Sequence, residues 1–186
     1  MNQKLELRNT VTAALLCSIG IIIPLFSPIK IIIEPASFTL ASHVAIFISM
    51  FISSSMALFV ALGTSIGFLF GGFPIIVVLR ALSHICFVLI GAYYININKK
   101  IITDIKSSIL FSIVIGVIHA ICEVLIVIPF YFGSYLSLGY YNQGFFINVI
   151  CLVGLGTLVH SIIDFSLSVY IWNLLPKTIT KRVSTK

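Results

Sequence analysis

The chain has 186 residues, of which 60% are hydrophobic and only 9% are charged, and its formal net charge is +6. Soluble domains carry about a quarter charged residues, so this composition argues against a soluble protein and indicates an integral membrane protein. The positive charges stand at the ends of apolar runs, as loop charges do in membrane proteins, and we therefore expect no nucleic-acid partner.

The apolar runs predict an all-α membrane protein in which residues 1–186 form a single transmembrane domain. A spanning helix needs about 20 apolar residues, so six helices and their loops nearly use up the chain. The first apolar run has no small-residue cleavage site after it, and we expect it to stay as a membrane helix. In chain order, the expected helices cover residues 9–27, 37–54, 56–71, 75–96, 107–131 and 144–175.

The first expected helix has a face made of small residues. Such faces, spaced at four residues, let two membrane helices approach closely, so a partner helix is one use for it and packing within the chain is the other. The residues concerned are Thr10, Ala13, Ala14, Cys17 and Ser18.

Lysine and arginine set the expected orientation, because cytoplasmic loops are enriched in them. With the N-terminus inside, nine basic residues fall on the inner side and only Lys30 falls on the outer side. Both termini are then cytoplasmic, as an even number of helices requires. The nine inner residues are Lys4, Arg8, Lys99, Lys100, Lys106, Lys177, Lys181, Arg182 and Lys186.

Polar side chains interrupt the apolar runs at a few positions. Arg80 is expected about one turn below the outer surface on the fourth helix, with His84 one turn deeper, and His43 in the outer third of the second helix. Buried charge costs several kcal/mol unless it is paired or hydrated, so these residues are candidates for a site. Arg80 has three open uses: reaching the outer headgroups, pairing with Glu123, or binding an anionic ligand.

Two histidines stand four residues before a carboxylate: His119 before Glu123, and His160 before Asp164. This spacing places each pair on one helix face. The first pair is a candidate for the site or for packing, and an intramembrane metal centre is a further alternative. The second pair is predicted to lie too deep for an outward-facing pocket, and we expect it to be structural.

Several motifs are absent from the sequence. There is no Walker phosphate loop, so we expect no ATP use by this chain, and no H-E-x-x-H or G-x-S-x-G that would indicate an enzyme. The four cysteines lie in apolar runs without a C-x-x-C, and we expect neither a disulfide nor a cofactor or metal bound by them.

Three stretches resemble a known family: "LASHVAIFISMFIS", "ALGTSIGFLFGGFPIIVVLRALSHICFVLIGAYY" and "GLGTLVHSIIDFSLSVYIW". The chain is similar over residues 9–175 to the substrate-binding S components of energy-coupling factor (ECF) vitamin transporters, and more narrowly to the niacin-type ones. The resemblance implies a six-helix bundle in a bacterial cell membrane. It also implies vitamin capture on the outer side and docking, through the first helix, onto a transmembrane coupling subunit driven by two ATPase subunits.

The resemblance implies a nicotinate site near the outer end of the fourth helix. Arg80 would take the carboxylate, and His84, His43 or the His119–Glu123 pair would supply further contacts. The segment between the first two helices, residues 27–38, would be one lid. Residues from the fifth helix, its outer loop and the start of the sixth would stack on or cover the ring: Tyr131, Tyr135, Tyr140, Tyr141 and Asn148.

Competing interpretations stay open at this stage. An S component for another anionic vitamin, such as pantothenate or biotin, would use Arg80 in the same way. A membrane enzyme or metal-site protein would use His119, Glu123, His160 and Asp164. A small membrane scaffold would need no pocket.

Overall fold

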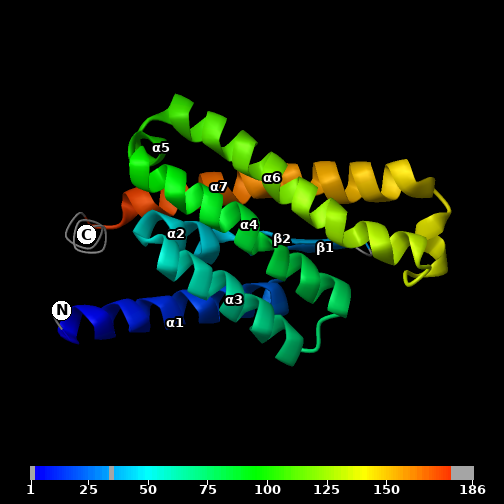
Figure 1. Cartoon of the computed structure of the whole chain (residues 1–186), viewed down its shortest axis with the longest axis horizontal. Coiled ribbons are helices and arrows are strands. Elements are labelled where there is room, and N and C mark those ends of the chain that lie inside the picture. Colours follow the sequence, from blue (N-terminus) through cyan, green and yellow to red (C-terminus); the bar gives the residue numbers. More distant parts are fainter. Residues whose placement is uncertain (1–2, 34–35, 177–186) are drawn as a thin grey trace.

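The computed structural model describes residues 3–33 and 36–176, and it is a bundle of helices with one short hairpin (Figure 1). The long helices lie roughly along one direction, and the hairpin enters between them. In chain order the elements are α1 (Gln3–Phe26), β1 (Lys30–Ile33), β2 (Ala36–Thr39), α2 (Val44–Ile52), α3 (Ser54–Phe70), α4 (Ile75–Ile97), α5 (Lys100–Thr103), α6 (Ile105–Phe132), η1 (Leu138–Tyr141), η2 (Phe146–Leu155) and α7 (Gly156–Leu174).

The hairpin corrects the predicted second helix, which was expected over residues 37–54. β1 pairs antiparallel with β2, from Lys30 opposite Thr39 to Ile33 opposite Ala36, so the helix begins only at Val44. The β-branched run at residues 31–33 favours an extended strand over a helix. Ala41, between β2 and α2, has a left-handed φ of 68°, and this turn redirects the chain into α2.

The predicted breaks around α3 are confirmed. Ser53 is extended, and its hydroxyl accepts a hydrogen bond from the Met56 N–H at 3.2 Å, which caps the N-terminus of α3. Gly72, which has a φ of 75°, follows the C-terminus of α3, and Pro74 precedes α4. These residues make α2 and α3 two separate helices and turn the chain back along the bundle.

The second half of the bundle starts at Asp104, which caps α6. Its carboxylate accepts from the Ser107 N–H at 2.8 Å, and this hydrogen bond holds the pKa of Asp104 below its ordinary value. The predicted sixth helix, 144–175, is observed as a π-helical segment, η2, that continues directly into α7.

In the described part of the chain, four helical segments are long and apolar enough to cross a membrane: Glu6–Phe26, Ile75–Ile97, Ile105–Phe132 and Phe146–Leu174. α3 is a shorter apolar helix, and α2 has only nine residues. The start of α1, the short helix α5 and the end of α7 lie at the same end of the molecule (Figure 1).

The small residues of α1 divide between two faces. A Cβ on Gly63 of α3 would lie 2.5 Å from the Cys17 sulfur, so this glycine lets α1 and α3 approach closely. Ala13 is buried on the same side. Thr10, Ala14 and Ser18 are exposed on the other side.

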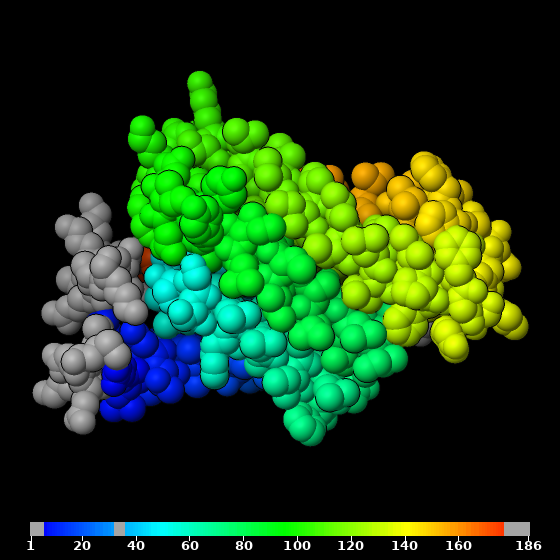
Figure 2. Space-filling view, in the orientation of Figure 1, coloured from blue at the N-terminus to red at the C-terminus, as the bar shows by residue number. Residues whose placement is uncertain are grey.

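An aromatic core lies inside the bundle, next to the polar residues. Phe47 and Phe51 of α2 pack edge-to-face against Phe165 of α7, and Phe87 of α4 lies 5.7 Å from Phe47 between ring centroids. In the space-filling view, α3, α4 and α6 form a continuous surface over this interior (Figure 2). Two of the polar residues described next, His84 and His119, pack against Phe87 of this core.

Candidate functional site: a buried histidine cluster

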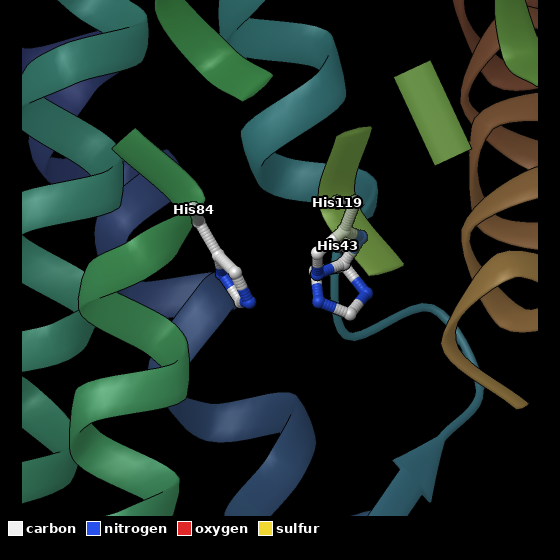
Figure 3. A group of neighbouring side chains, drawn as sticks. All are labelled: His43, His84 and His119. Carbon is white, nitrogen blue, oxygen red and sulfur yellow. The ribbon is translucent and has the colours of Figure 1, made fainter. Parts of the chain in front are cut away.

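All four histidines of the chain meet at one place in the bundle. His43 precedes α2, His84 lies on α4, His119 on α6 and His160 on α7. The His43 ring centroid lies 4.8 Å from those of His84 and His119 and 4.9 Å from that of His160. Three of these side chains are drawn in Figure 3, where His84 points from its helix toward His43 and His119.

Asp164 fixes the position of His43. Its carboxylate accepts from the Ala41 N–H at 2.8 Å and from the His43 N–H at 2.9 Å, so a side chain of α7 caps the N-terminus of α2. The same carboxylate lies 3.1 Å from Nδ1 of His43 and 3.3 Å from Nε2 of His160. The structural role expected for Asp164 therefore agrees with these contacts.

Glu123 is the second organising carboxylate, and it joins three helices. Arg80 of α4 donates to it at 2.7 Å, and Nε2 of His84 lies 3.3 Å away. His119, one turn earlier on α6, contacts it at 3.4 Å, and the Thr157 hydroxyl of α7 donates to it. Of the three uses considered for Arg80, the pairing with Glu123 is thus observed, and Arg80 is turned into the bundle.

A cavity of about 60 Å³ opens beside these groups. One water molecule needs about 15 Å³ of such cavity volume, although it occupies about 30 Å³ in the liquid. The cavity therefore has room for a few waters or one small ring. Its polar lining comes from five elements and their turns, and the β2 residues Ser37, Phe38 and Thr39 close one side. The charged, hydroxyl and imidazole residues of the lining are Ser37, Thr39, Ser42, His43, Thr64, Arg80, His84, Glu123, Thr157 and His160.

The predicted aromatic residues lie elsewhere, in a cluster at the junction of α6, η1 and η2. The Tyr131 ring lies 5.0 Å from that of Tyr141 and 5.9 Å from that of Tyr140. Tyr140 and Asn148 donate hydrogen bonds to each other's backbone carbonyls, and Tyr135 is 79% exposed. None of these five residues lines the cavity described above.

The sequence analysis did not predict His160, Thr157 and Ser42 as cavity residues, whereas Phe38 ends the segment 27–38 that was expected to be a lid. His160 was expected to lie too deep for an outward-facing pocket because it falls in the middle to inner half of the predicted sixth helix, 144–175. In the structure His43 precedes a short helix, and Ser42 bridges it to His160, with its hydroxyl 3.0 Å from the His160 Nε2. The equal four-residue spacing of the two histidine–carboxylate pairs was the available signal that both face one interior.

Comparison with known proteins identifies the family. The chain is 42% identical over 178 residues to the niacin transporter NiaX of Lactococcus lactis subsp. cremoris (strain MG1363), and the match covers 94% of this chain and 78% of that protein. No protein-family model and no solved structure matches the chain. The resemblance to niacin-type S components is confirmed, and the interpretation as an enzyme is not supported. The chain belongs to the NiaX family of niacin-type S components.

Proposed function

We propose that this chain captures niacin as the nicotinate anion in the cavity beside the histidine cluster. The relative's name supports the vitamin, and the observation that carries the site is the buried guanidinium of Arg80 on the wall of this cavity. A guanidinium recognises carboxylates through paired N–H donors, and its strength rises where water is excluded.

The carboxylate of the vitamin would share Arg80 with Glu123. Sharing is feasible because Glu123 also contacts Thr157, His84 and His119, so it keeps hydrogen-bond partners when the guanidinium turns toward a ligand. A ligand that lacks the negative charge gains less from Arg80. The site should therefore prefer nicotinate to nicotinamide.

The pyridine ring would lie against Phe38. This side chain lines the cavity from β2, and its ring centroid lies 5.6 Å from that of His160. Ser42 and His160, which also line the cavity, would hydrogen-bond the ring nitrogen. Because Ser37, Phe38 and Thr39 all line the cavity, we infer that the hairpin is the lid of the site.

The family supports a proposal for the wider assembly. The chain would cross the membrane six times, with both termini in the cytoplasm, and the shared end of α1, α5 and α7 supports this orientation. A transmembrane coupling subunit and two ATPase subunits would drive uptake. Because Ala13 and Cys17 pack toward α3, the exposed residues Thr10, Ala14 and Ser18 are the better docking face on α1.

Isothermal titration calorimetry on the detergent-purified chain tests the proposal. Nicotinate should bind tightly, nicotinamide at least tenfold more weakly, and pantothenate and biotin not at all. Arg80→Ala should lower nicotinate affinity by about 10- to 100-fold, since a hydrogen bond to a charged group contributes about 1.5–3 kcal/mol.

Lys106→Ala, which changes an exposed basic residue in the first turn of α6, is the matched control and should bind as the unchanged chain does. Binding of pantothenate or biotin instead of nicotinate would assign the chain to another anionic vitamin. If no vitamin binds, or if Arg80→Ala binds nicotinate with unchanged affinity, the proposed site is wrong.

A further inference from the structure

All four histidines have a carboxylate beside one ring nitrogen, which is typical of metal ligands, and three of them also lie close to one another through their rings. Asp164 lies 3.1 Å from Nδ1 of His43, and Glu123 lies 3.3 Å from Nε2 of His84 and 3.4 Å from Nε2 of His119. A histidine that binds a metal commonly donates its other ring N–H to a carboxylate, which fixes the tautomer and makes the ligating nitrogen more basic. Here each of the three imidazoles has such a carboxylate beside one of its nitrogens.

The remaining nitrogens point to a missing ligand. Nδ1 of His84 and both ring nitrogens of His119 are buried and make no hydrogen bond to the described residues, although Nε2 of His119 lies 3.4 Å from Glu123. Buried polar atoms are normally hydrogen-bonded, and three such imidazole nitrogens in one cluster need an explanation. The side chains themselves are almost fully buried, with 8% of His43, 6% of His84 and none of His119 exposed.

The three histidines are close enough to share one ion. One ring nitrogen from each lies within 4.8 Å of one from each of the other two. Zinc–nitrogen bonds of about 2.0–2.1 Å in tetrahedral geometry separate ligand nitrogens by about 3.4 Å, so small side-chain rotations would complete the site. In Figure 3 His84 points from its helix toward His43 and His119, whose side chains overlap in this view.

The charge of the cluster also favours a cation. With neutral imidazoles, the charged members are Arg80, Glu123 and Asp164, which sum to −1. If the proposed function holds, nicotinate adds a further negative charge, and a buried net charge of −2 is costly. A divalent ion at the histidines would bring the loaded site to zero.

We propose that His43, His84 and His119 bind one divalent transition-metal ion of the zinc type beside the vitamin cavity. Neutral imidazole suits Zn²⁺, Co²⁺ and Ni²⁺, whereas Mg²⁺ and Ca²⁺ prefer oxygen ligands. Three protein ligands leave a fourth position of a tetrahedral ion for water or for a carboxylate. Arg80 lines the same cavity as His43 and His84.

The test is a Co²⁺ titration in the absence of any vitamin. The chain is purified with an affinity tag free of histidine, stripped with a chelator, and followed by visible absorption. The expected result is one equivalent of Co²⁺ with the intense bands of a four-coordinate site, displaced by Zn²⁺ but not by Mg²⁺. An unchanged chain that binds no Co²⁺ overturns the proposal.

Variants identify the ligands. His84→Ala and His119→Ala should each lower Co²⁺ affinity at least 100-fold, whereas Cys86→Ala, an exposed thiol two residues from His84, should bind as the unchanged chain does. His160→Ala should also retain the metal. Loss in His160→Ala together with retention in His84→Ala would place the ion at His43, His160 and Asp164 instead and overturn the assignment.

Calorimetry with nicotinate separates this inference from the proposed function. Nicotinate should bind at least tenfold more tightly to the Zn²⁺-loaded chain than to the stripped chain. Tight nicotinate binding by a chain that takes up no Co²⁺ would overturn the metal site and leave the proposed function standing. Metal binding without any nicotinate binding would overturn the proposed function and leave the metal site standing.

Discussion

The histidine cluster and the aromatic cluster were predicted as parts of one site, and their surroundings differ. In the aromatic cluster, the side chains of Tyr140 and Asn148, eight residues apart, each donate a hydrogen bond to the other's backbone carbonyl. The ring contacts join residues that are close in the sequence. In the histidine cluster, four distant segments contribute, two carboxylates hold the imidazoles, and buried nitrogens stay without partners. Polar groups that are hydrogen-bonded within the protein indicate a structural role, whereas buried polar groups without such partners beside a cavity indicate a ligand.

Breaking the Arg80–Glu123 pair should have the largest effect on stability. Arg80→Ala leaves a buried carboxylate without its guanidinium, and we expect a loss of about 3–5 kcal/mol in the free energy of unfolding. The double variant Arg80→Ala/Glu123→Gln removes both charges and should recover a large part of that loss. Reversible unfolding in mixed detergents measures both, and equal stability of the single and double variants would contradict the pairing.

Removing Asp164 should disturb the histidine cluster without touching the cavity wall. Asp164→Ala takes away two hydrogen bonds at the start of α2 and one contact to His43. We expect a loss of about 2–3 kcal/mol of stability, because charged hydrogen bonds contribute about 1.5–3 kcal/mol. Hydrogen exchange should accelerate at residues 41–44, and unchanged protection there would show that the cap is unimportant.

Phe38→Ala tests the hairpin as part of the site. Aromatic pairs contribute about 0.5–1.5 kcal/mol beyond burial, so nicotinate affinity should fall about three- to tenfold. Leu40→Ala, an exposed apolar residue just after the same strand, is the matched control. An equal effect of the two variants would argue for a general change in the hairpin and against ring stacking.

Tyr140→Phe should have the smallest effect on binding. It removes a hydroxyl that donates to the Asn148 carbonyl, which we expect to cost about 1 kcal/mol of stability. Nicotinate affinity, measured by calorimetry, should stay within twofold. A large loss of affinity would return the aromatic cluster to the site and remove the contrast between the two regions.

Composition and hydrophobic period predicted the long helices well, because membrane spans depend on length and apolarity alone. They missed the hairpin, because the hydrophobic pattern of a short apolar run does not distinguish a helix from a strand. The pairing of the two strands also depends on residues on the other side of a turn. Arg80, His84, His119 and Glu123 were predicted from their cost inside a membrane. His160 was missed as a cavity residue, and Phe38 was expected only as part of the lid segment 27–38, because the convergence of α2, α7 and the hairpin is a tertiary property.

The most direct test of the account uses the four histidines as reporters. Because the chain has only four, ring-¹⁵N labelling of histidine gives an NMR spectrum that single substitutions can assign. Adding nicotinate should shift the ring signals of His43, His84 and His160, the histidines that line the cavity. Saturating nicotinate binding that leaves these signals unmoved would place the vitamin elsewhere and contradict the account.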